Sequence, residues 1–310
     1  MKKQLAQLLI CPACLPAEAA LQAEIVKEED EDIITGTLVC TGCKTRFGIE
    51  DGVAFLDPDR ERVREVANKY ETDAVVASYL WSHYAELLGD GNASEAYAAW
   101  ATRMQPHGGI SLDVGGAVGR FTFEMSAKCD FAIGIDNSVA FIKTARRLMK
   151  ERRMTFQLKD EGLLSNEVTI ALPSAWKSEK VEFIVGDALR LPFGNSTVSS
   201  LSSLNLVDKV PSPLRHLHEM DRVTKDKDAQ FLLSDPFSWS TDAADRDEWL
   251  GGKPDGPYAG KGLDNITRLL EEGKRAPAWR TEKPGSVWWK IRTHTNHYEL
   301  IRSCFVKASR

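Results

Sequence analysis

The sequence has no long uncharged hydrophobic run and no excess of positive charge. Its 310 residues include 40 Lys and Arg against 45 Asp and Glu, for a formal net charge of −5. Without a long apolar run, a membrane span is not expected, and the apolar stretch at residues 5–10 is too short for a secretory signal. A protein that holds a long nucleic acid by its phosphates would be strongly basic. We therefore expect a cytoplasmic protein, with nucleic acid disfavoured as a partner.

Cysteine is scarce outside the N-terminal part of the chain. Four of the six cysteines lie within the first 43 residues, as two Cys-x-x-Cys pairs separated by a hairpin-sized insert. In a cytoplasmic protein this spacing predicts a tetrahedral zinc site. Four thiolates leave no open coordination position, so the zinc is expected to be structural. The predicted metal ligands are Cys11, Cys14, Cys40 and Cys43.

The segment between the two cysteine pairs predicts a hairpin. Residues 21–26 and 33–39 have the composition of strands, and the acidic run 28–32 is expected at their solvated tip. A domain this small has little core, so metal binding would supply much of its folding free energy. We predict a zinc-ribbon domain over residues 1–57.

Residues 5–57 resemble the short zinc-binding domain that activates several tRNA and protein methyltransferases. The resemblance rests on the stretches Leu8–Cys14 and Phe47–Val53, while Ala54 stands where that family usually has proline. It implies a zinc ribbon that either is structural or docks a substrate or partner, and both interpretations stay open.

A dinucleotide-type glycine pattern is also missing from the chain. The apolar stretch 110–114 runs into the turn Asp113-Val114-Gly115-Gly116-Ala117-Val118-Gly119, with Ala117 where a dinucleotide loop has its middle glycine. This pattern suits a ligand without phosphates, such as S-adenosylmethionine. Gly115 is predicted to allow the tight turn and Gly119 the close approach of the next helix. Asp113 is predicted to orient the ammonium group of the ligand, directly or through water.

Two later strand-like stretches end in a carboxylate, at Asp136 and at Asp187. In a doubly wound sheet the carboxyl ends of the strands meet at the ligand crevice. Asp136 is predicted to accept hydrogen bonds from the ribose hydroxyls, and Asp187 from the adenine amino group, with Ala188 beside the ring. The predicted cofactor-binding residues are Asp113, Gly115, Gly116, Ala117, Gly119, Asp136, Asn137, Asp187, Ala188 and Asn205.

The glycine-rich turn, the strand-like stretch that ends at Asp136 and the stretch 186–193 resemble the corresponding parts of class I S-adenosylmethionine-dependent methyltransferases. The resemblance implies an α/β fold with a doubly wound, Rossmann-like sheet, and the length predicts about two domains. We expect the ribbon at 1–57, a helical segment at 58–108 that covers the cofactor, and the methyltransferase domain at 109–310. Among the aromatic residues of 61–88, such as Tyr70 and Tyr79, a tyrosine contact to the cofactor and simple packing on the sheet both stay open.

The later part of the chain is expected to bind the methyl acceptor. A fourth strand is predicted at 199–207, and an extra hairpin within 155–180. Asp208, next to the end of the fourth strand, either orients the acceptor or caps the next helix. The aromatic stretch 288–298 is expected to form a lid. The predicted catalytic residues are Asn205, Asp208, His297 and Tyr298.

A second, narrower resemblance covers most of residues 110–305. The stretches 205–210, 234–239 and 248–252 look like the methyltransferase domain of ovothiol biosynthesis, which methylates an imidazole nitrogen of a mercaptohistidine. That domain is usually fused to a sulfoxide synthase portion, whereas this chain carries the cysteine pairs instead. The resemblance implies a small thiol-imidazole as methyl acceptor.

Two other classes of function compete with this interpretation. A methyltransferase acting on rRNA, tRNA or protein would use the ribbon as a docking module, and only Lys44 and Arg46 near the second cysteine pair hint at a basic face. A non-catalytic cofactor-binding protein is disfavoured because the acidic positions Asp113, Asp136 and Asp187 are all present. The oligomeric state does not follow from the sequence.

Overall fold

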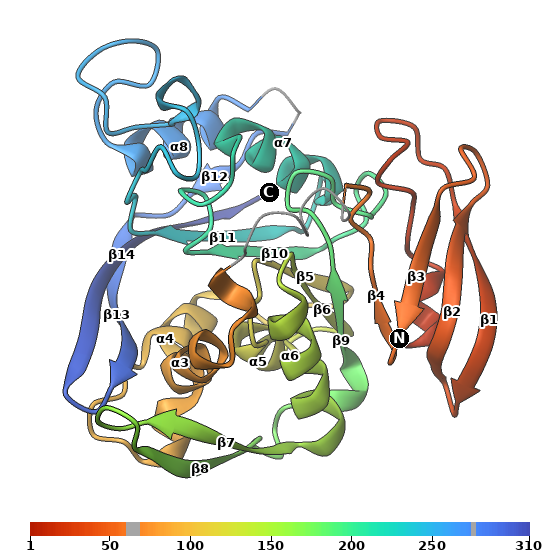
Figure 1. The fold of residues 1–310 in the computed structure, drawn as a ribbon. Coiled ribbons are helices and arrows are strands. Elements are labelled where there is room, and N and C mark those ends of the chain that lie inside the picture. The colour runs from red at the N-terminus through yellow and green to blue at the C-terminus, as the bar shows by residue number, and fades with distance from the viewer. Residues whose placement is uncertain (60–68, 274–276) are drawn as a thin grey trace.

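The computed structural model describes residues 1–59, 69–273 and 277–310. Residues 60–68, near the start of the helical segment expected at 58–108, lie outside the described residues. Within the described ranges the strands form a central sheet, a four-stranded N-terminal sheet and a two-stranded hairpin (Figure 1). None of the helices described combines the length and apolarity that a membrane span requires.

The central sheet has the doubly wound topology that the sequence predicts. The chain runs outward through three parallel strands, crosses back, and adds two more parallel strands on the other side. These five strands are buried along almost their whole length, as expected for a sheet that has helices on both faces. An antiparallel strand, β14, follows β11. The sheet order is β12 (Arg280–Thr281), β14 (His297–Ser309), β11 (Gln230–Asp235), β10 (Ser200–Leu204), β5 (Ile110–Val114), β6 (Phe131–Asp136) and β9 (Val181–Val185), with β13 (Gly285–His294) paired to β14.

Helices cover both faces of this sheet. Figure 1 shows α3, α4, α5 and α6 on one side and α7 and α8 on the other. Ser138 caps α6 by accepting the Phe141 N–H at 3.1 Å, and Pro213 opens α7, where its missing N–H costs nothing. The helices are α3 (Asp73–Tyr84), α4 (Ala96–Arg103), α5 (Arg120–Met125), α6 (Val139–Glu151), α7 (Pro213–Val223) and α8 (Gly262–Glu271), with 3-10 turns at Lys69–Glu71, Ala85–Leu88, Ser178–Lys180 and Arg246–Glu248.

Two hairpins extend beyond the sheet. The N-terminal half of β14 runs past the carboxyl end of β11 and pairs there with β13. The extra hairpin expected within 155–180 is present as β7 (Arg153–Lys159) and β8 (Ser165–Ala171). The two hairpins touch, because Arg292 donates to the carbonyl of Lys159 at 3.2 Å and the Thr295 N–H to that of Asp160 at 3.4 Å. The β7–β8 hairpin therefore supports the β13–β14 hairpin.

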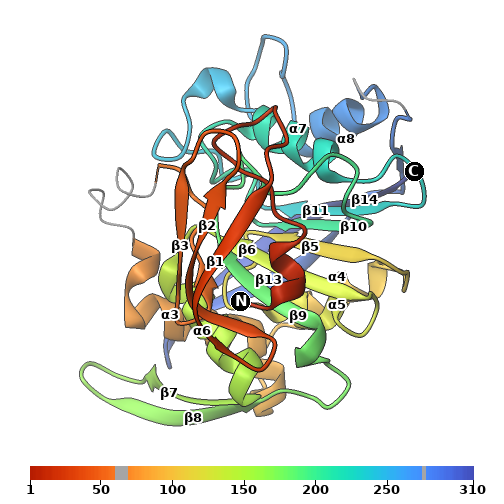
Figure 2. The same ribbon diagram turned by 90° about the vertical axis from the view of Figure 1, so that its right-hand side faces the viewer.

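The N-terminal sheet packs against the far edge of the central sheet, as Figure 2 shows from the side. Phe55, just after its last strand, bridges Val185 of β9, and the Leu56 N–H donates to the Val185 carbonyl at 2.7 Å. The contact covers the edge of β9, which otherwise would offer unpaired backbone groups. One hydrophobic cluster also joins both sheets, with Phe47 and Phe193 among its members. The elements are α1 (Lys3–Ala6), β1 (Leu21–Glu29), β2 (Asp32–Cys40), β3 (Arg46–Glu50) and β4 (Val53–Ala54).

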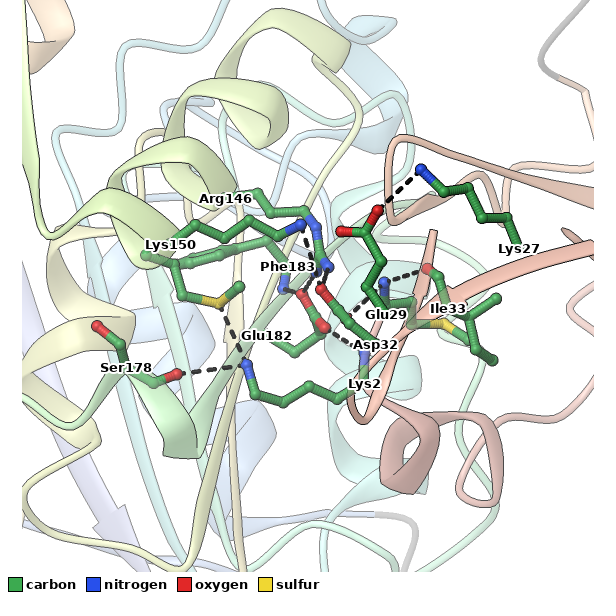
Figure 3. Close-up of polar contacts among 12 residues, drawn as sticks. Lys2, Lys27, Glu29, Asp32, Ile33, Arg146, Lys150, Ser178, Glu182 and Phe183 are labelled. Carbon is green, nitrogen blue, oxygen red and sulfur yellow. Dashed lines mark hydrogen bonds and ion pairs between the residues drawn. The ribbon is translucent and has the colours of Figure 1, made fainter. Parts of the chain in front are cut away.

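A buried ionic cluster fixes the tip of the β1–β2 hairpin to the central sheet. Arg146 of α6 pairs with both Asp32 at the hairpin tip and Glu182 of β9, and the Lys2 N–H donates to Glu182 at 2.5 Å (Figure 3). Burial raises the pKa of Asp32, but Arg146 opposes this and leaves it at about 2. The expectation of a fully solvated acidic tip is thus wrong at Asp32, whose side chain is only 20% exposed. Its partner lies 114 residues away in the sequence.

We expect Arg146→Met to lower the free energy of unfolding by about 3–5 kcal/mol, because it leaves the fully buried Glu182 carboxylate without its cation. Urea unfolding followed by circular dichroism would measure the loss. Arg147→Met is the matched control, since the neighbouring Arg147 forms only an exposed pair with Glu151. Equal stability of the two variants would contradict a stabilising role for the cluster.

Candidate functional site

The carboxyl ends of the parallel strands open into a cavity of about 620 Å³. Each of the five strands contributes a residue at or just after its end, namely Gly115, Asp136, Asp187, Asn205 and Pro236. This is the crevice where open α/β sheets bind ligands. Asn137, Ala117 and Ala188, also predicted from the sequence, line the same cavity.

The glycine-rich turn and Asp136 are held together by backbone hydrogen bonds. The Ala117 N–H donates to one carboxylate oxygen of Asp136 at 3.0 Å, and the Ser138 N–H to the other at 2.9 Å. Burial raises the pKa of Asp136 to about 6. Gly115 has φ of +77°, which a residue with a side chain adopts only with strain. The turn is thereby fixed with Asp136 facing the cavity.

Asp113, which is predicted to orient the ammonium group of the ligand directly or through water, is not among the residues that line the cavity. It is 3% exposed and accepts hydrogen bonds from Thr122 at 2.9 Å and Ser202 at 2.8 Å. It therefore joins β5, α5 and β10. Gly119 and Gly116 are also outside the lining: a Cβ on Gly119 would lie 2.6 Å from the ring of Phe183, so this glycine permits the close packing of α5.

Asp187 and Ala188 follow β9 at the other end of the cavity. Asp187 accepts the Leu189 N–H at 2.8 Å, and burial raises the pKa of its carboxyl group. The ring of His216, from α7, lies 3.2 Å from the Ala188 carbonyl and 2.9 Å from the Ser203 hydroxyl. This buried histidine ties the loop after β9 to β10.

Aromatic residues of α3, α4, α6 and the 3-10 turn before α3 form a wall that the catalytic and cofactor predictions omitted. Tyr70 and Tyr79 line the cavity beside Phe141, whose ring centroid lies 4.7 Å from that of Tyr79. One turn further along α3, His83 also lines it, and the Tyr97 hydroxyl lies 2.6 Å from His83 Nε2. Positions 79 and 83 share one helix face, so their spacing is the signal that reveals this wall.

The β13–β14 hairpin forms the opposite wall. Trp289, Ile291 and Thr293 of β13 line the cavity together with Glu299 and Ile301 of β14. These are alternate positions, as expected for one face of a hairpin.

His297 and Tyr298 are not among these lining residues, so the structure does not bring them to the cavity as expected. Tyr298 lies on the other face of β14, with its ring centroid 5.3 Å from that of Trp81. His297, the first residue of β14, is exposed, and its Nδ1 lies 2.5 Å from the Thr293 hydroxyl. The side on which each residue of the hairpin falls depends on its register, which the local sequence does not determine.

Asn205 lines the cavity, whereas its neighbour Asp208 does not. Asn205 adopts φ of +57°, and its Oδ1 accepts the Ser303 hydroxyl of β14 at 2.6 Å. Asp208 is buried, accepts the Ser238 N–H at 2.7 Å and pairs with Lys209 at 3.1 Å. It holds the loop after β11, and the N-cap position of α7 is Ser212 instead. Both expected roles of Asp208 therefore differ from its contacts.

The four N-terminal cysteines come together at one end of the small sheet. Their sulfur atoms all lie within 4.8 Å of one another. The Cys11 and Cys43 sulfurs are 3.8 Å apart, and those of Cys14 and Cys40 are 3.6 Å apart. Tetrahedral zinc with Zn–S bonds of about 2.3 Å requires sulfur separations of about 3.8 Å. The cluster therefore fits a single metal ion.

Residues 112–229 match a family model described as a methyltransferase domain. The chain is also similar to a methyltransferase from Methanosarcina mazei described as SAM-dependent, at 18% identity over 67% of this chain and 95% of that one, with a TM-score of 0.43. Haemonchus contortus phosphoethanolamine N-methyltransferase 2 gives 15% identity, coverage of 77% and 48%, and a TM-score of 0.46.

A chain in a complex that contains the Haloferax volcanii Trm112 methyltransferase activator gives 13% identity, coverage of 79% and 98%, and a TM-score of 0.46. No curated protein sequence matches the chain significantly. The family match runs from β5 to the residue before β11 and so includes Gly115, Asp136, Asp187 and Asn205. Together with the fold and the cavity, it supports a class I, S-adenosylmethionine-dependent methyltransferase.

Proposed function

We propose that the protein methylates a nitrogen atom of a small imidazole-containing acceptor of the thiol-histidine type. The observation that carries the proposal is the cavity, which has carboxylates at the ends of β6 and β9 and aromatic side chains of α3 and β13 in its walls. Ligand cavities of this size accept small molecules. The imidazole acceptor comes from the resemblance of the later segments to the ovothiol-pathway domain.

In this proposal the cofactor lies across the ends of β5, β6 and β9. Asp136 accepts the ribose hydroxyls: each of its oxygens receives one backbone N–H and keeps a further lone pair. Asp187 accepts from the adenine amino group beside Ala188. Gly115, Ala117 and Asn137 complete the surface, while Asp113 fixes the turn through Thr122 and Ser202.

When bound, S-adenosylmethionine supplies an electrophilic methyl group on a good sulfonium leaving group. The protein then needs mainly to orient the acceptor in line with that methyl group and to exclude water. An imidazole nitrogen attacks with its own lone pair, so no strong base is required. Of the acceptor-binding residues predicted from the sequence, Asn205 is the one on the cavity wall.

The alternative acceptors, rRNA, tRNA or protein, would use the ribbon as a docking module. The ribbon packs on the edge of β9, whereas the β13–β14 hairpin that walls the cavity lies at the opposite end of the sheet (Figure 1). Of the two basic residues near the second cysteine pair, Arg46 is already paired with Glu24 at 2.6 Å. These contacts favour a structural ribbon, with zinc held by Cys11, Cys14, Cys40 and Cys43.

Labelled S-adenosylmethionine offered together with histidine-derived thiols, total RNA and a protein extract tests the acceptor directly. We expect label on the imidazole ring of a mercaptohistidine. Label in RNA or protein alone would reject the small-molecule acceptor and assign the ribbon a docking role. Absence of cofactor binding would reject the methyltransferase altogether.

We expect Asp136→Asn to weaken binding of S-adenosylhomocysteine by roughly ten- to a hundredfold, because hydrogen bonds from the ribose to a charged carboxylate are lost. Since burial raises the pKa of Asp136 to about 6, wild-type affinity should also fall as the pH drops through about 6 and the carboxyl becomes protonated. Calorimetric titration measures both effects. Asp130→Asn, just before β6, should bind like the wild type.

Zinc analysis of the purified protein should give one ion per chain. Cys40→Ser should lose the metal and lower the melting temperature by about 5 °C or more, because the small sheet depends on the ion for much of its stability. Cys129→Ser, at a buried cysteine far from the cluster, should retain the metal. Full metal content in Cys40→Ser would contradict the four-cysteine site.

A further inference from the structure

Three polar atoms of residues that line the cavity have no hydrogen-bond partner within the described part of the chain. They are His83 Nδ1 on α3, Asn205 Nδ2 after β10 and Trp289 Nε1 on β13. His83 and Trp289 are only 3% and 5% exposed. Buried polar groups in native proteins nearly always have a partner, so each exception calls for an explanation. A ligand in the cavity supplies one here.

Asn205 and Trp289 both contact β14, at Ser303 and Ile301 respectively. The Ser303 hydroxyl donates to Asn205 Oδ1, which leaves the amide Nδ2 as the free end of that side chain. Ser303 in turn pairs with Val287, two residues before Trp289 and on the same face of β13. Both free groups are N–H donors, since an indole nitrogen cannot accept.

His83 adds a third donor. Burial keeps its imidazole neutral by lowering the pKa of His83 well below its ordinary value, and Arg120 adds to this effect. A neutral ring carries one proton. The Tyr97 hydroxyl lies 2.6 Å from Nε2 and has no other hydrogen-bond partner within the described part of the chain. We therefore assign the hydroxyl as the donor in this bond, which places the ring proton on Nδ1.

Because all three unpartnered groups are N–H donors, the ligand group that meets them must offer hydrogen-bond acceptors. A carboxylate does so with two oxygens and about four lone-pair sites, and its hydrogen bonds are strong because it is charged. Lys209 also lines the cavity, but its ammonium group already pairs with Asp208 at 3.1 Å, and the acidic residue Glu299 of β14 lies in the same lining. The three N–H groups are therefore the donors that such an anion would meet. Asp136 and Asp187, which serve the adenosine in the proposed function, lie at the ends of β6 and β9. The donors instead belong to α3, β10 and the hairpin.

Building on the proposed methyl transfer, we propose that His83, Asn205 and Trp289 bind the carboxylate of the methyl acceptor. The acceptor is then an amino acid or another small carboxylic acid. The cofactor also has a carboxylate, on its amino-acid end, and the tests below separate these two sources.

The first test pairs acids with their decarboxylated amines as methyl acceptors for the wild-type protein. The pairs are mercaptohistidine with mercaptohistamine, histidine with histamine, and the other protein amino acids with their amines. We expect label on an acid and at least about tenfold less on its amine. Label on an acid other than a mercaptohistidine would reject the proposed acceptor but keep this inference. Equal label on acid and amine, or no label on any acid, would overturn it.

The second test is Trp289→Phe, which removes the indole N–H and keeps an aromatic ring. For the labelled acid we expect KM to rise about tenfold, with unchanged affinity for S-adenosylhomocysteine. Trp288→Phe is the control, because Trp288 is the next residue and is 57% exposed. Weaker binding of S-adenosylhomocysteine, with unchanged binding of methylthioadenosine, would assign the donors to the cofactor and overturn the inference. An unchanged KM would also overturn it.

Discussion

The parallel pairing of five strands is the constraint on which the rest of this structure depends. Parallel strands end at the same edge of the sheet, so Gly115, Asp136, Asp187 and Asn205 meet there although they span 91 positions of the chain. Because strand order reverses between β5 and β10, the helices on the two sides diverge and leave the crevice open. The chemistry of the cavity then depends on which side chains the elements outside the sheet add.

Those additions come from α3 and from the β13–β14 hairpin. The β13–β14 hairpin extends beyond the carboxyl end of β11 because β14 is longer than β11, with which it pairs antiparallel. The β7–β8 hairpin supports it through the bond from Arg292 to Lys159. Between them, α3 and β13 bring His83 and Trp289 to the cavity wall, and each of these residues has a buried polar atom with no partner among the described residues. These walls are the part of the site to which we assign the acceptor in the proposed function.

The N-terminal sheet is part of the same folded body. Its last strand leads directly into a backbone contact with β9, and the Arg146, Asp32 and Glu182 cluster fixes its tip. A buried ion pair adds little stability beyond an apolar pair of similar size, but it penalises any arrangement that separates the charges. The cluster thus determines how the small sheet sits on the large one.

The sequence by itself determined where four strands of the central sheet lie, the two cysteine pairs, and the polar residues at the strand ends. Each of these follows from local spacing: alternation, a tight turn or two cysteines in one knuckle. Only the tertiary structure decided that Asp113 joins β5 to β10 and that Asp208 holds the loop after β11. The same is true of the contacts of Tyr298 with Trp81 and of Asp32 with Arg146. Those roles depend on hairpin register and on contacts between residues far apart in the chain. Both are set by tertiary packing, which the local sequence does not encode.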